Sequence, residues 1–164
     1  MRRRRAESGI TLLEMMIVMT IVALMVGVLY PNIAAGLESM RMRSATDSVA
    51  AFLSQGMLRA ERTQEPVELI LQPASGRMEL RGAVAGFQKT LLLPDGITIL
   101  HVFPDLPGEL PEERSILFLP ASNVPAIGIE LLNRRGLRRL VRIDPLTGNP
   151  VVETPSASVS GEER

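Results

Sequence analysis

One carboxylate lies inside a long apolar stretch near the start of the chain, and this apolar environment makes it the first candidate for a functional residue. Residues 10–30 are apolar apart from Glu14, two threonines and one glycine. As a helix this stretch would rise about 31 Å, which matches the roughly 30 Å hydrocarbon core of a bilayer. A carboxylate at mid-membrane costs about 2.5–3.5 kcal/mol, so we expect Glu14 to be kept there for a function.

The same stretch is predicted to span a membrane once. Residues 2–5 are four consecutive arginines, and the positive-inside rule keeps such an end in the cytoplasm. A secretory signal peptide is a second interpretation, but its apolar region normally runs for about 7–15 residues. A plain membrane anchor is a third interpretation, and it gives Glu14 no role.

The residues around Glu14 resemble a known processing motif. The run GITLLE at residues 9–14 is similar to that of type IV prepilins and of the pseudopilins of type II secretion. The resemblance implies that a membrane aspartyl peptidase cleaves after Gly9 and that Ile10, where phenylalanine or methionine is commoner, is then N-methylated. It also implies that Glu14 neutralises the terminal ammonium of a neighbouring subunit during filament assembly. That role fits the rule that a buried charge needs a partner.

The chain divides into five predicted segments. Pro31 falls where many helices of this family carry a proline, and we expect it to interrupt or bend the helix. Beyond it, apolar residues recur every three or four positions to about Thr63, which predicts an amphipathic helix. The last residues are rich in Pro, Ser, Gly and Glu and are predicted to be disordered. The segments are a basic leader (1–9), the membrane-spanning half of the helix (10–30), its amphipathic half (31–64), a β-rich head (65–153) and a tail (154–164).

The head is predicted to be a mainly antiparallel β-sheet. Turn sequences rich in Pro, Gly, Asn and Asp separate β-compatible runs, and they predict hairpins across residues 73–76, 94–96 and 133–136. A sheet packed on the amphipathic half of a long N-terminal helix places the fold in the α+β class. The predicted strands are 67–72, 77–81, 87–93, 97–103, 115–119, 127–132, 137–143 and a short edge at 151–152.

Three segments of the head narrow the resemblance. Residues 114–120 (RSILFLP), 127–131 (IGIEL) and 140–148 (LVRIDPLTG) are similar to the minor pseudopilin H family of type II secretion and to its FimT-like relatives among minor type IV pilins. The residues after Pro120 depart from the acidic-glycine turn that is usual in this family. The resemblance implies a non-enzymatic subunit of a short pseudopilus that drives the export of folded proteins.

The same resemblance implies a location and a set of partners. The protein would be anchored in the bacterial inner membrane by one span, with its N-terminus in the cytoplasm and its head in the periplasm. Its partners would be the prepilin peptidase, other major and minor pseudopilins, the inner-membrane platform, the assembly ATPase and the lipid of the inner membrane.

The composition excludes several classes of site. The chain has 164 residues, no cysteine and a single histidine, which rules out disulfides, thiolate catalysis, sulfur-ligated metals and sites with two imidazoles. His101 lies in an apolar strand with no nucleophile motif, so it is interpreted as a structural residue. No Gly-rich phosphate loop is present in the sequence. We therefore expect no enzymatic activity, no cofactor and no metal.

Two polar segments of the head keep two interpretations each. The predicted last hairpin carries a basic cluster. One interpretation is a surface that binds the phosphate backbone of DNA, because some FimT-like relatives bind DNA for uptake. A solvated edge or ion pairs to a neighbour are favoured, because no aromatic residues interleave for base stacking. The acidic, proline-rich loop 104–113 is either a partner contact or a plain solvated loop. The alternative assignment of the chain is thus a FimT-like minor pilin for pilus initiation or DNA binding. The basic cluster consists of Arg134, Arg135, Arg138, Arg139 and Arg142.

Overall fold

The computed structural model describes residues 11–83, 86–105, 112–121 and 125–154, without the side chains of residues 28–35. The chain divides into two compact units, Met1–Ser39 and Met40–Arg164, and each is described by itself. Helix α1 (Leu12–Thr63) begins in the first unit and ends in the second, which also contains the strands. The predicted leader (1–9) lies outside the described residues, as does the predicted tail (154–164) apart from Thr154.

Helix α1 begins and ends with residues that suit its two termini. Glu14 lies in its first turn and Arg62 in its last turn, where each charge interacts favourably with the helix dipole. Gln64 follows the helix with a φ of 55°, the left-handed conformation in which helices commonly end. The predicted end of the helix near Thr63 is confirmed.

Helix α1 continues through Pro31, so it is not interrupted there, while the bend that was the other predicted effect of this proline stays a prediction. Residues 31–36 belong to the same unbroken α-helix as the residues on both sides. A proline in a helix interior removes one intrahelical hydrogen bond and crowds the preceding turn, at a cost of about 3 kcal/mol. A helix as long as α1 (52 residues) makes enough other backbone hydrogen bonds to tolerate that loss.

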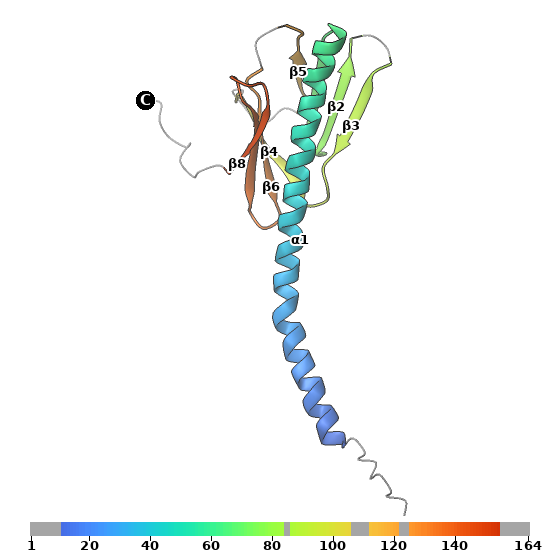
Figure 1. Ribbon diagram of the computed structural model, residues 1–164, viewed down its shortest axis with the longest axis vertical. Coiled ribbons are helices and arrows are strands. Elements are labelled where there is room, and N and C mark those ends of the chain that lie inside the picture. The colour runs from blue at the N-terminus through green and yellow to red at the C-terminus, as the bar shows by residue number, and fades with distance from the viewer. Residues whose placement is uncertain (1–10, 84–85, 106–111, 122–124, 155–164) are drawn as a thin grey trace, which may run out of the picture. The chain divides into compact units, whose positions relative to one another are not determined.

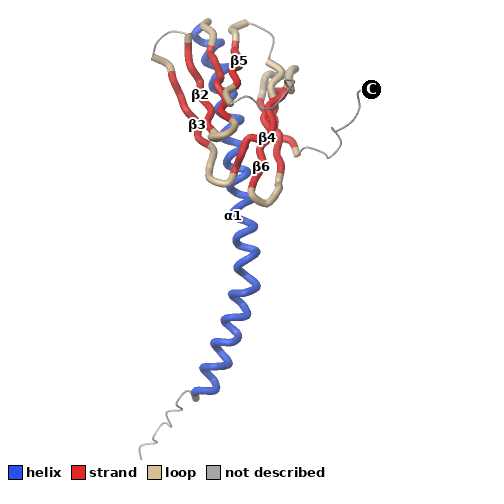
Figure 2. The backbone as a smooth tube through the Cα atoms, turned by 180° about the vertical axis from the view of Figure 1, so that it is seen from behind, coloured by secondary structure: helices blue, strands red, loops and turns tan. Residues whose placement is uncertain are grey.

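The second unit contains two antiparallel sheets of four strands each, where the sequence predicts a single sheet. Sheet A has the strand order β3-β2-β1-β5, and sheet B has the order β4-β6-β7-β8. Figure 1 shows α1 running along both sheets, and Figure 2 shows the same arrangement from behind. The strands are β1 (Val67–Gln72), β2 (Arg77–Gly82), β3 (Gln88–Leu92), β4 (Ile97–Phe103), β5 (Arg114–Phe118), β6 (Gly128–Asn133), β7 (Arg138–Ile143) and β8 (Pro150–Glu153).

The turn at residues 94–96 connects the two sheets, so the predicted hairpin across it is wrong. Strand β3 pairs with β2, whereas β4 pairs with β6. The turn itself forms: the Ile97 amide donates to the Pro94 carbonyl at 3.1 Å, and Gly96 has a φ of 87°. A turn reverses the chain, but strand pairing needs a matching partner edge, and here the chain passes from one sheet to the other. The hairpins across 73–76 and 133–136 are confirmed.

The hydrophobic core lies between α1 and the two sheets, as the α+β prediction requires. Gly56 marks a close approach of the helix to sheet A, because a Cβ atom placed on it would lie 2.7 Å from both Leu80 Cδ2 and Phe118 Cε2. Buried apolar side chains come from the helix (Met42, Ala45, Val49, Phe52, Leu53, Ala60), from sheet A (Val67, Leu69, Leu71, Met78, Leu80, Phe118) and from sheet B (Ile97, Ile99, Val102, Ile129, Leu131, Val141, Ile143).

A buried arginine connects the two sheets. Arg114 lies at the start of β5 in sheet A and is only 8% exposed. Its guanidinium donates hydrogen bonds to the carbonyl of Val102 in sheet B and, at 2.6 Å, to the carbonyl of Pro104. The planar guanidinium carries several donors in a fixed fork, so one side chain can bond both carbonyls at once.

Candidate functional site

The carboxylate singled out in the sequence lies in the first turn of α1. The Glu14 amide donates to the Thr11 hydroxyl at 3.2 Å, and the Met15 amide donates to the Thr11 carbonyl at 3.2 Å. Thr11 therefore caps the helix, and the T-x-x-E spacing of Thr11 and Glu14 is that of a capping box. The position places the Glu14 carboxylate beside the positive end of the helix dipole.

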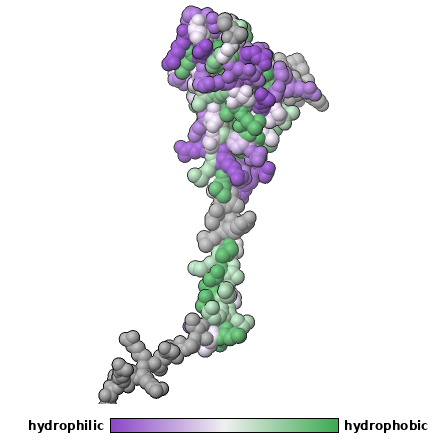
Figure 3. Space-filling model, turned by 90° about the vertical axis from the view of Figure 1, so that its right-hand side faces the viewer, coloured by the Kyte–Doolittle hydropathy of each residue, from purple (hydrophilic) through white to green (hydrophobic). Residues whose placement is uncertain are grey.

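An unbroken apolar surface surrounds Glu14. The large apolar side chains of residues 12–26 are all exposed, at 47% or more of their surface, and they point to every side of the helix. Figure 3 shows this part of α1 as almost entirely hydrophobic. Thr20, the other polar residue in this part, donates its hydroxyl to the Met16 carbonyl at 2.8 Å. A helix that is apolar all round needs a protein core or a bilayer around it. The exposed residues are Leu12, Leu13, Met15, Met16, Ile17, Val18, Met19, Ile21, Val22, Leu24, Met25 and Val26.

The structure describes only part of the other residues predicted to take part in processing and assembly. Gly9 and Ile10 lie outside the described residues, so cleavage and N-methylation stay predictions. The predicted span 10–30 is also incomplete, since the side chains of residues 28–30 are not described. Within the residues that are described, no helix is long and apolar enough to cross a membrane.

The structure distributes the predicted basic cluster over two places. Arg134 and Arg135 are exposed at the β6–β7 connection. The other three arginines lie along β7, where Arg139 donates to the Thr154 hydroxyl at 2.6 Å. Arg138 lies 3.7 Å from the Glu130 carboxylate, and Arg142 lies 2.8 Å from that of Glu153.

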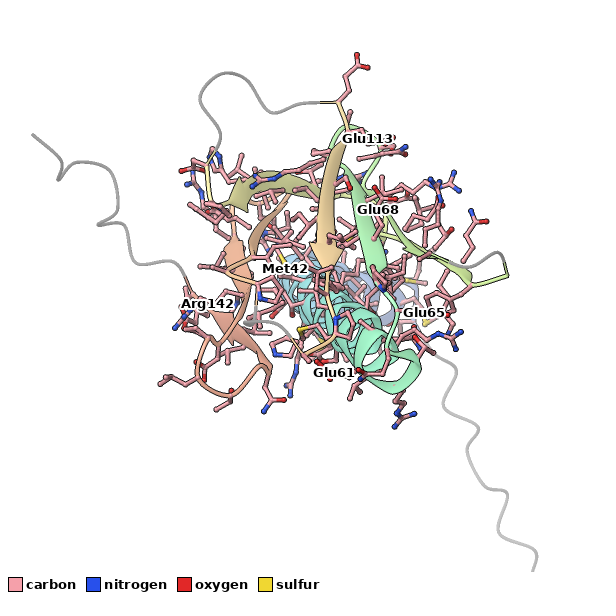
Figure 4. The ribbon with its side chains drawn as sticks, turned by 90° about the horizontal axis from the view of Figure 1, so that it is seen from above. Met42, Glu61, Glu65, Glu68, Glu113 and Arg142 are labelled. Carbon is pink, nitrogen blue, oxygen red and sulfur yellow. The ribbon has the colours of Figure 1, made fainter. Side chains whose placement is uncertain are left out.

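Arg138 and Arg142 of β7 and their acidic partners form one row on sheet B. Glu130 of β6 and Glu153 of β8 are both paired with Leu140 of β7, which lies between Arg138 and Arg142. The hydrogen bond from Arg142 lowers the pKa of Glu153, and that bond also raises the pKa of Arg142. Figure 4 shows Arg142 on the side of sheet B that faces away from the helix. Two of the five arginines of the cluster therefore already have carboxylate partners within the chain.

His101 does not lie in a catalytic arrangement. It is exposed on β4, opposite Glu130 in the sheet ladder, with its ring centroid 6.4 Å from that of Phe103. Among the described residues, no three His, Cys, Asp or Glu side chains gather as a metal site would require.

Two structural side chains were not identified from the sequence. Glu130 is a buried carboxylate at 5% exposure in the middle of an apolar run, and nothing in that run indicates its arginine partner. Asp144 accepts hydrogen bonds from the Leu146 amide at 3.0 Å and from the Thr147 hydroxyl at 2.9 Å. The D-P-x-T-G sequence at residues 144–148 is a turn signal, and it could have identified Asp144 as the residue that accepts these hydrogen bonds.

A groove of about 310 Å³ lies beside the last turns of α1. Its walls come from Met57 and Leu58 of the helix, from Phe118 and Leu119 at the end of β5, and from residues 147–149. Glu61 at its edge accepts the Ala121 amide at 3.0 Å and so helps to fix the chain after β5. The groove offers apolar contact surface rather than a set of converging polar groups.

Two comparisons with known proteins, one with a family model and one with a curated relative, support the resemblance to prepilin-type proteins and pseudopilins. A family model for the prokaryotic N-terminal methylation motif matches residues 4–30. The chain is 32% identical over 83 residues to the type II secretion system protein H of Xanthomonas campestris pv. campestris, which covers 51% of this chain and 49% of that protein. The chain thus matches about half the length of this curated relative. No solved structure matches it.

The family model matches the residues that carry the resemblance at the N-terminus. The methylation motif includes the GITLLE run and the apolar stretch that follows it. The chain therefore carries the N-terminal motif of prepilin-type proteins, and its resemblance to the pseudopilins of type II secretion, of the H type, is confirmed.

Proposed function

We propose that this protein is a minor pseudopilin of a type II secretion system and that it assembles into the pseudopilus through its N-terminal helix. Pilin-type proteins are structural subunits anchored through the N-terminal segment. The observation that carries the proposal is Glu14, a carboxylate in the first turn of a helix whose surface over residues 12–26 is otherwise apolar. Such a charge needs a cationic partner when the helix is buried.

The proposed partner of Glu14 is the terminal ammonium of a neighbouring subunit. Cleavage after Gly9 would leave Ile10 as the N-terminus, one residue before the Thr11 cap of α1. The new positive charge would lie at the positive end of the helix dipole, where it is disfavoured unless an anion comes close. A carboxylate from an adjacent helix supplies that anion, so helix burial and charge pairing would occur together.

The proposal places the protein in the inner membrane before assembly. Residues 10–30 would cross the bilayer with the arginine-rich end in the cytoplasm, and the second unit would stand in the periplasm. The peptidase, the platform, the ATPase and the other pseudopilins would act on or contact this subunit there. The exported proteins would be moved by the filament and would need no catalytic site in this chain.

Replacing Glu14 by alanine in the host bacterium tests the proposal. We expect the variant to be cleaved and inserted in the membrane, while secretion falls to the level of a strain that lacks the protein. Asp47→Asn removes an exposed carboxylate from the second half of the same helix and serves as the matched control. Intact-mass analysis reports cleavage and methylation, and enzyme assays of the culture medium report secretion.

Two results would contradict the proposal. Normal secretion by the Glu14→Ala strain would remove the role assigned to this residue. Normal secretion by the strain lacking the protein, together with lost pili or lost DNA uptake, would support the FimT-like alternative instead.

A further inference from the structure

The end of the second unit at which α1 enters carries arginines and exposed apolar side chains together. Figures 1 and 2 show the β3–β4 and β6–β7 connections at this end of the unit. We call this surface the basal face and define it by Met40 and Arg43 of α1 and by Arg134, Arg135 and Leu137 of the β6–β7 connection. All five residues are exposed.

Contacts within the basal face fix the positions of two of its arginines. Arg134 lies against the β3–β4 turn, since a Cβ atom placed on Gly96 would lie 2.8 Å from the Arg134 Nε atom. The buried Asn133 side chain accepts the amides of Arg135 and Leu137 at 2.9 and 2.8 Å, which fixes the backbone of the connection. The arginines are thus presented by a structured turn.

The chemistry of the basal face resembles that of membrane-contacting surfaces. Met40 is 71% exposed and Leu137 is 36% exposed, although apolar side chains in water gain nothing from such positions. Arginines beside exposed apolar groups are typical of segments that lie at a lipid headgroup layer. The three arginines of the basal face outnumber the two exposed carboxylates near them, which are Asp47, one turn after Arg43 on α1, and Asp95 in the β3–β4 turn.

We propose that the basal face binds the anionic phospholipid headgroups of the membrane in which the N-terminal helix is anchored. The inference rests on the proposed function, which puts the helix in that membrane. A guanidinium matches a phosphate with two parallel hydrogen bonds, so lipid phosphates fit these side chains chemically. Each arginine near an anionic membrane favours association about fivefold.

The short connection between the predicted span and the second unit is compatible with this contact. Only nine residues, 31–39, separate the span predicted at 10–30 from Met40, the first residue of the basal face. The field of an anionic surface extends about 8 Å beyond the headgroup layer at physiological salt, so the arginines need not touch the lipid to be attracted to it.

Fluorescence quenching in nanodiscs tests the proposal with the full mature chain. The chain has no cysteine, so a single Leu137→Cys substitution labels the basal face alone. Leu146→Cys labels the β7–β8 connection, which lies at the other end of β7 and where the leucine is 92% exposed. One set of discs contains phosphatidylcholine alone. In the second set, phosphatidylglycerol makes up half of the lipid. Both sets carry a headgroup-linked nitroxide quencher.

We expect strong quenching at position 137 in the anionic discs, weak quenching in the phosphatidylcholine discs, and little at position 146 in either. Raising the salt to 1 M shortens the Debye length to about 3 Å and should remove the difference between the discs. Arg134→Glu with Arg135→Glu should lower the quenching at 137 to the phosphatidylcholine level. Arg62→Glu, at the far end of α1, should leave it unchanged, and circular dichroism checks the fold of each variant.

The outcomes separate this proposal from the proposed function. Equal quenching at position 137 in both kinds of disc, or quenching that survives the double charge reversal, would overturn the lipid contact while the membrane anchor stands. Failure of the mature chain to enter discs of either composition would overturn the membrane anchor and the lipid contact with it.

Discussion

Asp144 shows how a single side chain fixes a turn of this protein. Both of its carboxylate oxygens accept hydrogen bonds from the turn that follows β7, one from the Leu146 amide and one from the Thr147 hydroxyl. The Leu146 amide, and then the Thr147 hydroxyl, lower the pKa of this carboxyl below its ordinary value. The ionised form is therefore the form that stabilises the fold.

The direction of the pKa shift predicts a pH dependence. Stability from Asp144 is fully present above its unfolded pKa of about 3.9 and is lost as the pH falls through the lower folded value. Asp144→Asn should therefore lose stability relative to the natural chain at pH 7, and the difference should shrink as the pH falls below about 4. Urea unfolding in detergent at pH 7 and at pH 3 measures it, with Asp95→Asn as the control. A difference that is the same at both pH values would contradict the role of the charge.

Gly56 is a second residue whose size matters. A Cβ atom there would meet Leu80 and the Phe118 ring at 2.7 Å. Overpacking of this kind costs about 1–3 kcal/mol, against a gain of up to about 1 kcal/mol in helix propensity. We expect Gly56→Ala to destabilise the fold by about 1–2 kcal/mol in urea unfolding.

Gly36 in the same helix provides the matched control for Gly56. A Cβ atom at Gly36 has nothing within 4 Å, so Gly36→Ala should cause no loss of stability. If the two variants behaved alike, the close approach at Gly56 would not be decisive for packing.

At the scale of the element, Arg114 makes the two sheets depend on each other. From sheet A, its guanidinium bonds the carbonyl of Val102 in β4 of sheet B and that of Pro104, just after β4. A buried carbonyl left without its donor costs about 1–3 kcal/mol. We expect Arg114→Met to lower the free energy of unfolding by about 2–4 kcal/mol, as measured by chemical denaturation.

An exposed arginine of the same sheet is the control for Arg114. Arg77 begins β2, and its side chain is 48% exposed. Arg77→Met should change stability by no more than about 0.5 kcal/mol. Equal effects of the two substitutions would show that the link between the sheets adds nothing.

At the scale of the whole molecule, the arrangement of charge argues against a DNA-binding surface. Arg138 and Arg142 lie beside Glu130 and Glu153, so phosphates would have to displace carboxylates that are already in place. Non-specific DNA binding depends on the number of phosphates that cations can neutralise. The balance of 18 basic and 18 acidic residues gives no general attraction either.

We therefore expect no retention of duplex DNA by the full chain at physiological salt. Gel-shift titration between about 50 and 200 mM salt measures it, since true phosphate contacts give a steep salt dependence. Retention that disappears in Arg138→Ala with Arg142→Ala would contradict this expectation and revive the FimT-like alternative.

Local sequence patterns determined much of this protein. The 10–30 stretch and the GITLLE run depend on residue types in neighbouring positions, so the resemblance to prepilin-type proteins needed no fold. The strands at 67–72 and 97–103 and the helix end near Thr63 also agree with the structure. Apolar spacing and turn residues act over a few positions, and they can be identified in the chain itself.

Tertiary structure decided what depends on distant residues. The split into two sheets follows from which strand edges match, and the turn at 94–96 is compatible with either outcome. Pro31 stays helical because the rest of a long helix makes up for one lost hydrogen bond. The pairing of Arg138 with Glu130 and of Arg142 with Glu153 needed the register of β6, β7 and β8. These features arise from contacts between segments far apart in the chain, and only packing sets those contacts.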